Sequence, residues 1–593
     1  MAAASLFTAL VSVMMQGIAI GETFRVLSYV EAISLPLFFA AGVVCAGLLF
    51  ALTYVWGSTK PLGTVLLLSY LLFAFLTVCD SESSIFLSLG LSLPLFLILR
   101  WVMASDDRLP NLRLSKRDFT LAFAGGLFIA FTALLSYYAI LRYRTYYATT
   151  FDLGLFAQMF EQLRRTGHAW TTMERNQLLS HFGVHCSPIY YLLLPFYMLV
   201  PRVETLLVLQ AAAVGAGVFA VRSIARQLFG NSPRIIMAAC LMYICNPALG
   251  QWCLWDFHEN KFLPVLLLWA FYFLLRNKTI PLLMFSGLVL MVKEDAAIYV
   301  CALALYYLMQ RPWIWSIKKE RKRILTGIAM IAMSVVWFVI AISIVRHFGN
   351  GVMVDRLRNY FLPNGGKSFV DVIKVCLFDL AYVIKECFSH EKVIFLVWVF
   401  LPFGFVPFLQ KKGAAWLLLL PMLVINLMPN YGYQYALGYQ YTCGSLILAL
   451  LLALVTLKDL RPNLRRGILI FAVSTSILIT IPILGGRFQR YSDTMRINKV
   501  RIAAVDQIME ELNALPPEVE ITATTWFGVH LYKRDHIYMF PNYHGESRPT
   551  EYLLSKPEEA EDNEALQAFI LEHGYILEQE TAFLQVYRLI SAD

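Results

Sequence analysis

Charge is scarce in this sequence: Asp, Glu, Lys and Arg together make up 15% of its 593 residues. Globular proteins carry about 25% charged and about 45–50% apolar residues, whereas 59% of this chain is hydrophobic. A water-soluble protein of this composition would lack the polar side chains needed to cover its surface. The composition therefore excludes a cytosolic enzyme and a disordered protein, and it predicts a polytopic membrane protein whose excess apolar side chains face lipid.

Cysteine and N-terminal basic residues are also scarce. The ten cysteines form no CxxC pair, and most lie within or at the ends of apolar segments, where a thiol acts as a small apolar side chain. This distribution excludes a disulfide-stapled secreted fold and predicts no metal site from cysteine spacing. A disulfide between Cys376 and Cys387, which lie outside those segments, is left open. No basic residue precedes the first apolar segment, near residues 5–21, so we do not expect a cleaved signal peptide.

The positive charges predict the topology. Lys and Arg outnumber Asp and Glu by 49 to 40. Most of the Lys and Arg residues lie in short loops, and short loops rich in these residues stay in the cytoplasm. We therefore interpret the excess as a topological marker and not as a nucleic-acid-binding surface. The pattern predicts a multi-pass plasma-membrane protein with a cytoplasmic N-terminus, an extracytoplasmic C-terminus and about fifteen spans. These spans lie near residues 5–21, 31–56, 61–78, 84–103, 118–141, 205–226, 234–254, 261–275, 280–292, 296–309, 324–345, 393–409, 413–428, 440–457 and 467–484.

One apolar segment, residues 187–200, does not fit this alternation. It is 14 residues long and contains Pro188 and Pro195, and counting it as a span would place the later basic loops outside the cell. We therefore predict an interfacial or re-entrant helix on the outer face.

The last part of the chain changes character. It combines helix-like stretches near residues 496–513 and 558–572 with the strand-like segments "EVEITATT" and "FLQVYRLI", which predicts a small extracytoplasmic α/β domain. The predicted fold class is thus mainly α, a polytopic transmembrane helical bundle followed by that domain. The expected units are a four-span N-terminal extension at 1–117, a membrane core at 118–484 with an outer loop at 142–204, and the C-terminal domain at 485–593.

Ionisable residues gather on the predicted outer face. Lys293, Glu294 and Asp295 interrupt an apolar stretch, where each charge at bilayer depth costs about 2.5–3.5 kcal/mol. The chain must therefore turn there or line a wet cavity. The predicted topology brings this trio to the same side as the outer-loop residues Asp152, His181, His185, Asp256, His258 and Glu259. Together these residues supply a carboxylate base, a cation and a phosphate or metal site.

Each of these signals has a plainer explanation. For the trio, the plainer explanation is that Lys293 pairs with Glu294 or Asp295 and so lowers the cost of insertion. For Asp256, it is that the side chain caps a helix. The spacing of His181 and His185 suits a zinc-binding pair on a helix, but the sequence offers no clear third ligand. The convergence of the signals on one face is what favours a functional site.

An ordered set of motifs resembles a bacterial membrane family known as domain of unknown function 2079. The resemblance covers roughly residues 120–590 and leaves the first four spans outside. It rests on "FDLGLFAQMFEQLRRTGHAW", "WDFHEN", "LMVKEDAAIYV", "LPFGFVPFL", "GYQYTCGSLILALL" and "HLYKRDHIYMFPNY". That family in turn is similar to the GT-C superfamily of membrane glycosyltransferases, which includes the protein O-mannosyltransferases.

The resemblance implies transfer of a sugar from a polyprenyl-phosphate donor to a cell-envelope acceptor. Asp152 stands where the superfamily has its catalytic acid in the first outer loop, and it is expected to act as the base. Lys293 and Arg175 are expected to neutralise the charge of the leaving phosphate. Glu294 and Asp295 are expected to belong to the same donor-binding site. Asp256, His258 and Glu259 are expected either to orient the donor sugar or to hold a divalent ion, and the C-terminal domain to help select the acceptor.

Two other functions compete with this one. In a transporter or flippase of a lipid-linked or small polar substrate, the acidic clusters would form the substrate or proton pathway. Such proteins place ionisable groups at mid-depth and show broken helices in matching halves, a pairing that the sequence does not display. A non-catalytic scaffold that displays the C-terminal domain would tolerate alanine at Asp152, His258 and Lys293.

Overall fold

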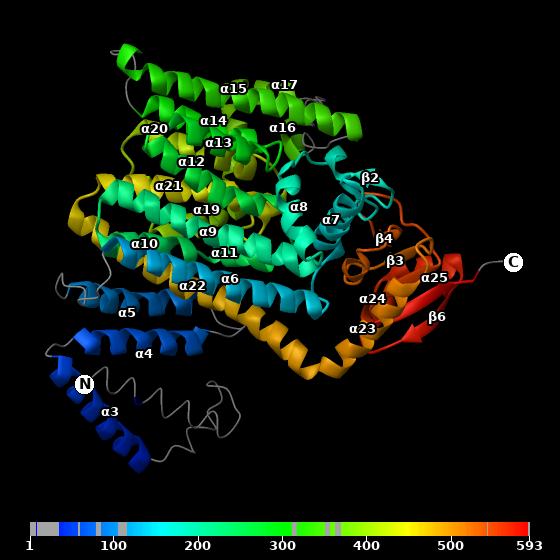
Figure 1. The fold of residues 1–593 in the computed structure, drawn as a ribbon, viewed down its shortest axis with the longest axis horizontal. Coiled ribbons are helices and arrows are strands. Elements are labelled where there is room, and N and C mark those ends of the chain that lie inside the picture. The colour runs from blue at the N-terminus through cyan, green and yellow to red at the C-terminus, as the bar shows by residue number, and fades with distance from the viewer. Residues whose placement is uncertain are drawn as a thin grey trace.

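The computed structural model describes Thr8 and residues 35–56, 60–78, 85–104, 116–310, 317–349, 356–361, 369–542 and 544–590. The span predicted near residues 5–21 lies outside these ranges apart from Thr8. Helices stacked side by side form a bundle, and the C-terminal domain lies at one end of it (Figure 1).

Three N-terminal helices lie at the edge of the bundle, α3 (Leu35–Trp56), α4 (Lys60–Val78) and α5 (Ile85–Ala104). Tyr70 and Ala74 of α4 and Leu95 of α5 pack against Leu478 of α22 (Pro462–Ile497). This small apolar cluster joins the extension to the rest of the bundle.

Six helices are long and apolar enough to cross a bilayer within the described part of the chain. They are α3, α6 (Lys116–Arg144), α9 (Val203–Phe229), α15 (Ile317–Phe348), α21 (Cys443–Asp459) and α22. Helix α21 is buried over most of its length and lies at the centre of the bundle. The fold is therefore mainly helical with several apolar spans.

Other predicted spans are shorter or broken. Helices α10 (Pro233–Ile244) and α11 (Pro247–Leu254) meet at a bend of 41° before Pro247 and at most add a seventh span. Helices α12 (Leu263–Leu275), α13 (Thr279–Leu290) and α14 (Ala296–Met309) have 12 to 14 residues. At about 1.5 Å per residue each is only about 18–21 Å long, against about 30 Å of hydrocarbon.

The predicted spans 393–409 and 413–428 are not continuous helices. Helix α19 (His390–Phe400) ends two residues before Pro402, and Gly404 and Phe405 both adopt left-handed backbone conformations. Short 3-10 and π turns follow, at η6 (Leu401–Phe403), η7 (Val406–Leu409), η8 (Leu417–Leu419) and η9 (Met422–Leu427), with the one-turn α20 at Gly413–Trp416. Proline lacks the N–H that a continuous helix needs, so apolar content alone overstated the helix lengths here.

Helix α8 (Ile189–Leu199) is the segment predicted not to span. Its 11 residues measure about 16 Å, and the backbone N–H of Ile189 donates to the carbonyl of Met291 at 3.0 Å. Tyr190 and Tyr197 are buried, whereas Leu199 is 79% exposed. The helix thus presents one apolar face outward.

The outer loop between α6 and α8 is compact. It contains η1 (Thr150–Gly154), α7 (Leu155–Thr166), the antiparallel strands β1 (Trp170–Thr171) and β2 (Leu179–Ser180), and η2 (His181–Gly183). The remaining short elements are η3 (Glu259–Phe262), α16 (Arg358–Phe361), α17 (Phe369–Phe378), α18 (Leu380–Cys387), η10 (Gly432–Tyr435) and η11 (Gln440–Thr442). Cys376 and Cys387 are free thiols, so the disulfide left open by the sequence does not form here.

The C-terminal domain follows without a break, because α22 continues past residue 485 to Ile497 and leads into α23 (Lys499–Ala514). Its five-stranded mixed sheet has the order β4-β3-β5-β7-β6. Strands β4 and β5 pair with β3 in parallel, and β7 pairs antiparallel with β5 and β6. The elements are β3 (Ile521–Ala523), η12 (Gly528–Leu531), β4 (Ile537–Met539), β5 (Tyr552–Ser555), α24 (Pro557–Asp562), α25 (Glu564–His573), β6 (Tyr575–Glu580) and β7 (Gln585–Leu589).

The C-terminal domain binds the outer loop through buried hydrogen bonds. The Thr150 backbone N–H donates to the Thr525 carbonyl at 2.7 Å. Asn176 accepts from the Met539 N–H and donates to the Met539 carbonyl, both at 2.8 Å. Gly154 packs so closely that an added Cβ would lie 3.1 Å from the Val529 Cα. The loop and the domain therefore form one unit at the end of the bundle.

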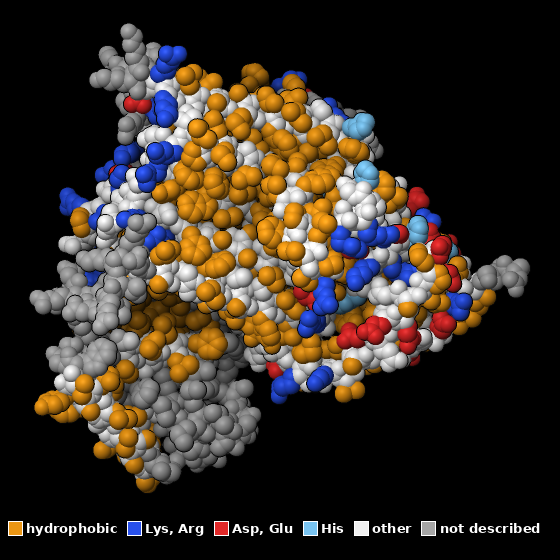
Figure 2. Space-filling model, in the orientation of Figure 1, with side chains coloured by type: hydrophobic (Ala, Val, Ile, Leu, Met, Phe, Trp, Pro, Cys, Tyr) orange, Lys and Arg blue, Asp and Glu red, His pale blue; other side chains and the backbone are white. Residues whose placement is uncertain are grey.

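Basic side chains gather in two places on the face shown in Figure 2. One group lies at the end of the bundle away from the C-terminal domain, where α9 ends after Arg226 and α12 before Arg276. The second lies between the apolar surface of the bundle and the C-terminal domain. The first group agrees with the loop pattern of the sequence, and the assignment of that end to the cytoplasm stays a prediction.

Candidate active site

A cavity of about 700 Å³ lies between the outer loop, the segment after α15 and the aromatic segment before α21. Five of the sequence-predicted residues line it, namely Asp152, Arg175, His181, His185 and His258. The other lining residues are Phe151, Leu155, Phe156, Glu174, Val184, Arg356, Arg358, Asn359, Asn430, Tyr431, Gln440, Tyr441 and His544. The other sequence-predicted residues are not among the lining residues; they are Asp256, Glu259, Lys293, Glu294 and Asp295.

Asp152 lies on the π turn η1, which follows α6 and places the carboxylate against the cavity. Its Oδ2 accepts a hydrogen bond from the Trp255 indole N–H at 3.3 Å. Burial, reinforced by the nearby Asp256 carboxylate, raises the pKa of Asp152 to about 7. A pKa near neutral pH suits Asp152 to act as a general acid or base.

Asp256 is buried and supports the part of the cavity wall that Asp152 contacts. Its carboxylate forms an ion pair with Arg142 and accepts a hydrogen bond from the Thr149 hydroxyl. The Arg142 guanidinium also lies over the Trp255 ring, 5.2 Å from its centroid. Asp256 therefore does not cap a helix: the following turn, η3, is capped by His258, whose side chain accepts from the Asn260 N–H.

Glu259 is the centre of a buried polar network. Its Oε1 lies 3.2 Å from the Lys293 ammonium, and its Oε2 accepts from the Tyr190 hydroxyl at 2.8 Å. His258 Nδ1 lies 3.1 Å from the same Oε2. Burial lowers the pKa of Lys293, but the combined attraction of the Glu259, Glu294 and Asp295 carboxylates outweighs it and the net shift is upward. Lys293 is thus a buried, protonated cation paired across the fold.

Of the two acidic residues that follow Lys293, Glu294 has hydrogen-bond partners of its own. Glu294 accepts from His185 Nδ1 at 2.8 Å and from the Cys186 backbone N–H at 2.9 Å. Burial raises the pKa of Asp295 to about 6, although Lys293 opposes the shift. The pairing of Lys293 with Glu294 or Asp295 that the sequence offered as an explanation is thus replaced by the ion pair with Glu259.

A third histidine of the cavity also contacts a glutamate. His181 Nδ1 lies 2.9 Å from Glu174, and its Nε2 lies 3.3 Å from the Tyr190 hydroxyl. Burial lowers the pKa of His181, but Glu174 outweighs it and raises the pKa overall. For His185 and His258 burial dominates, reinforced by Lys293, and their pKa values fall well below the usual range. Among the three imidazoles of the cavity wall, His181 thus holds its proton more tightly than an ordinary histidine, whereas His185 and His258 hold theirs more weakly.

A metal ion does not fit these residues. Within the described ranges no group of three or more His, Cys, Asp or Glu side chains has the arrangement of a metal site. His181 Nδ1 is already bound by Glu174, and His185 Nδ1 by Glu294. We therefore derive no chemical step through a metal.

The structure adds residues that sequence reasoning missed. The Arg356 guanidinium lies 4.7 Å from the ring centroids of both Tyr431 and Tyr441. Its buried Nη1 has no hydrogen-bond partner among the described residues. The C-terminal domain contributes His544, whose ring lies 5.5 Å from that of Phe151. The tyrosine-rich run "NYGYQYALGYQY" at 430–441 is the sequence signal from which this wall could have been predicted.

A second groove of about 390 Å³ lies on the other side of Trp255. Trp255 and Tyr439 pack edge to face with ring centroids 4.9 Å apart, and both line it together with Arg487. Ile394, another lining residue, is 44% exposed on the apolar surface of the bundle. The groove therefore connects the apolar surface with the indole that contacts Asp152.

Comparison with known proteins places the chain among polytopic membrane proteins. It belongs to the family described as "Predicted membrane protein (DUF2079)", which it matches over residues 142–580. Comparison with curated proteins gave no match.

Two of the similar solved structures are crystal structures of ArnT from Cupriavidus metallidurans. The first, bound to undecaprenyl phosphate, is 12% identical, with a TM-score of 0.49 over 79% of this chain and 98% of that one. The second, in the apo state, is 13% identical, with a TM-score of 0.47 over 79% of this chain and 99% of that one.

Proposed function

We propose that this protein is a GT-C-type membrane glycosyltransferase that moves a sugar from a polyprenyl-phosphate donor to an extracytoplasmic acceptor. The observation that carries the proposal is the cavity that combines Asp152, with its pKa of about 7, and the guanidinium groups of Arg175 and Arg356. A general base works best when its pKa lies near the working pH. A guanidinium can bind a phosphate through two parallel hydrogen bonds. The motifs that resemble GT-C transferases favour the same chemistry.

In the proposed reaction Asp152 removes the proton from an acceptor hydroxyl as its oxygen attacks the anomeric carbon of the donor sugar. A new C–O bond forms, and the bond from that carbon to the phosphate oxygen breaks. The polyprenyl phosphate leaves with the bonding electrons. Arg356, held between two tyrosine rings, stabilises the negative charge on the phosphate.

The positions of the residues change the roles expected from the sequence. Lys293 is 4% exposed and bound to Glu259, so we assign the phosphate to Arg356 and Arg175. Lys293 becomes a positioning residue that holds Glu259 and, through it, His258. His185 and His258 are neutral and line the cavity, and their ring nitrogens are suited to form hydrogen bonds with sugar or acceptor hydroxyls.

The second groove suits the lipid part of the donor. A polyprenyl chain needs an apolar path from the bilayer, and Ile394 and Phe395 provide one beside Arg487. Trp255 separates this groove from Asp152, so a donor whose phosphate lies near the indole would present its sugar to the main cavity. His544 then places the C-terminal domain where it can contact the acceptor.

The proposal is tested in cells whose own copy of the gene has been deleted. Mass spectrometry of extracted lipids and of the envelope fraction should show accumulation of one polyprenyl-phosphate sugar and loss of one glycosylated component. The unaltered protein should reverse both changes, and Asp152→Asn should reverse neither at equal membrane abundance. Asp493→Asn, in an exposed carboxylate paired with Arg496, is the matched control and should restore both.

Two outcomes contradict the proposal. Full restoration by Asp152→Asn would remove the base, and a deletion strain with unchanged lipid-linked sugars would remove the donor class. A transporter or flippase would instead change which side of the membrane its substrate occupies, without loss of a glycosidic bond.

A further inference from the structure

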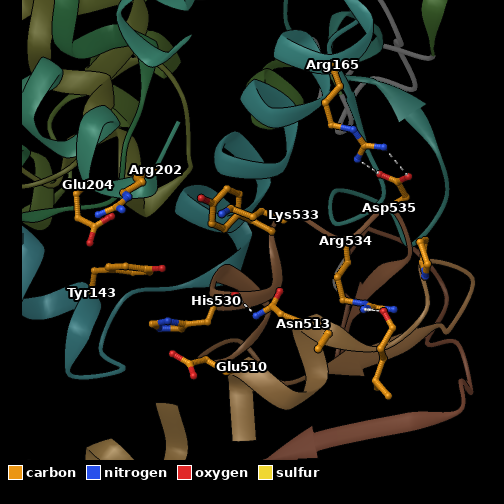
Figure 3. Close-up of a pocket in the computed structure, with 14 residues that line it drawn as sticks. Tyr143, Arg165, Arg202, Glu204, Glu510, Asn513, His530, Lys533, Arg534 and Asp535 are labelled. Carbon is orange, nitrogen blue, oxygen red and sulfur yellow. Dashed lines mark hydrogen bonds and ion pairs between the residues drawn. The ribbon is translucent and has the colours of Figure 1, made fainter. Parts of the chain in front are cut away.

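A second large cavity, of about 670 Å³, lies where the C-terminal domain meets the bundle (Figure 3). Tyr143, near the end of α6, and Arg202, just before α9, line it from the bundle. His530 and Lys533 line it from the C-terminal domain. None of these four residues lines the cavity that contains Asp152.

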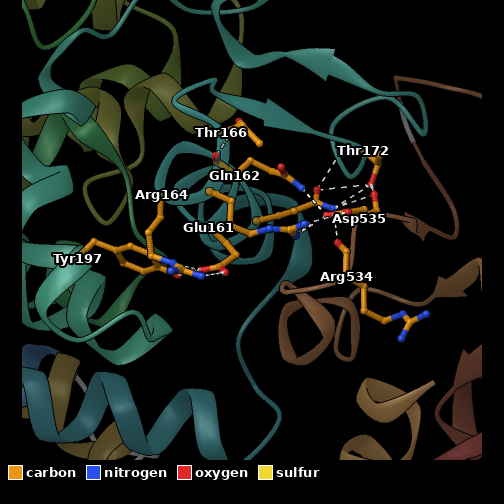
Figure 4. Close-up of polar contacts among 10 residues, drawn as sticks. Glu161, Gln162, Arg164, Thr166, Thr172, Tyr197, Arg534 and Asp535 are labelled. Carbon is orange, nitrogen blue, oxygen red and sulfur yellow. Dashed lines mark hydrogen bonds and ion pairs between the residues drawn. The ribbon is translucent and has the colours of Figure 1, made fainter. Parts of the chain in front are cut away.

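Most of the charged groups in this cavity already have partners. Asp535 binds Arg165 at 2.7 Å (Figure 3) and accepts from the Gln162 amide at 2.6 Å (Figure 4). Glu204 binds Arg144 at 3.1 Å. The Arg534 guanidinium donates to the backbone carbonyls of Leu512, Leu515, Pro516 and Val519.

Arg202 and Lys533 are left without a carboxylate partner among the described residues. They come from the two sides of the cavity, the start of α9 and the C-terminal domain. One lining carboxylate, Glu510, also has no basic partner there. The unpaired charge of the cavity is therefore positive, which favours an anionic ligand.

The wall of the cavity is aromatic and carries an unpaired nitrogen. The His530 ring stacks on Tyr143 with centroids 4.4 Å apart and an angle of 7°, and Tyr146 lies 4.2 Å from its centroid. His530 Nε2 is buried and has no hydrogen-bond partner among the described residues. Burial lowers the pKa of His530 to about 3, so the ring is neutral.

The cavity also lies beside the apolar surface of α8. Leu199 and Val200, at the end of that helix, are 79% and 51% exposed. The next residue, Pro201, accepts a hydrogen bond from the Tyr532 hydroxyl at 3.3 Å, and Arg202 follows directly. The apolar surface thus ends where the cations begin, and Figure 2 shows Lys and Arg side chains along the same boundary.

We propose that this cavity binds the headgroup phosphate of an anionic membrane phospholipid and so anchors the C-terminal domain to the bilayer. Arg202 and Lys533 contact the phosphate, and the Tyr143–His530 stack forms a flat wall for the headgroup. The acyl chains leave along the exposed face of α8. An apolar surface next to a basic patch is the arrangement by which proteins bind anionic lipid surfaces. This proposal is independent of the glycosyltransferase chemistry.

The proposal is tested by native mass spectrometry of the full-length protein in detergent with phosphatidylglycerol or phosphatidylcholine added. We expect the unaltered protein to retain phosphatidylglycerol preferentially. A basic residue near a lipid surface contributes about 1 kcal/mol, or about 5-fold in affinity. Arg202→Gln with Lys533→Gln should therefore weaken phosphatidylglycerol binding by about 30-fold and remove the preference for phosphatidylglycerol over phosphatidylcholine.

The matched control is Arg496→Gln with Arg588→Gln, which removes the same charge from exposed ion pairs away from the cavity. It should change the affinity less than about 2-fold. An equal loss in both double variants, or no lipid preference in the unaltered protein, would overturn the proposal. Inorganic phosphate that binds as tightly as phosphatidylglycerol would show a site for soluble anions, which also contradicts it. Gel filtration and thermal melting verify that both double variants are folded.

Discussion

The ion pair between Glu259 and Lys293 supports the cavity wall, and removing one partner should destabilise the protein strongly. Their side chains are 0% and 4% exposed, and the charged atoms lie 3.2 Å apart. At an effective dielectric constant of about 20, two unit charges at 3.2 Å attract by about 5 kcal/mol. Loss of one partner leaves a buried charge unpaired, so Lys293→Met should lower the free energy of unfolding by about 3–5 kcal/mol.

The double variant measures the interaction energy between Glu259 and Lys293 apart from the energy of their other contacts. Glu259→Gln with Lys293→Met leaves no unpaired charge, so its cost should be smaller than the sum of the two single costs by about 2–3 kcal/mol. The assay is reversible unfolding of the full-length protein in mixed micelles, followed by circular dichroism. The exposed pair Asp493–Arg496, 3.0 Å apart, is the control and should show a coupling of about 0–1 kcal/mol. Additive single costs, or a loss below about 1 kcal/mol for Lys293→Met, would refute the reasoning.

Three further predictions concern other parts of the fold. Sugar transfer should fall as the pH drops below about 7, because the raised pKa of Asp152 leaves the base protonated there; initial rates from pH 5 to 9 test this. Gly183→Ala should lower the melting temperature, because its Cβ would meet the Phe348 carbonyl oxygen at 2.7 Å, whereas Gly126→Ala, with no atom within 4 Å, should not. Asn176→Ala should cost about 1–3 kcal/mol by leaving backbone groups of β4 unpaired. Its left-handed backbone, with φ of 53°, adds to the cost, and faster release of the C-terminal domain in limited proteolysis is the measurement.

The outer-face residues illustrate what a sequence can predict. The cost of burying charge implied that the segment around Lys293 turns, and charge alternation brought Asp152 and His258 to the same side. Five of the predicted residues do line one cavity. The partner of Lys293 was not predictable, because Glu259 reaches it only through tertiary packing of segments far apart in the chain. Arg356 was missed because its setting depends on two tyrosines from a later segment.

The span count shows a different limit. Hydropathy measures how apolar a segment is but not whether its helix is continuous. Around Pro402 and Pro407 the apolar stretch folds into short turns. Helix α13 ends at Leu290, two residues before the predicted end of its span, whereas α14 matches the predicted span 296–309. In the C-terminal domain the strand-like segments predicted β3 and β7, whereas β4, β5 and β6 were missed, because short strands gain most of their stability from neighbours.

The most direct test of the central claim measures donor binding and sugar transfer separately in purified Asp152→Asn protein. The change keeps the size of the side chain and removes only its capacity to accept a proton. We therefore predict unchanged binding of a polyprenyl-phosphate sugar and a transfer rate lower by about 10²–10⁴-fold. Arg356→Gln should instead weaken the binding of the donor. Transfer that persists in Asp152→Asn at more than about a tenth of the normal rate would contradict the assignment of Asp152 as the base.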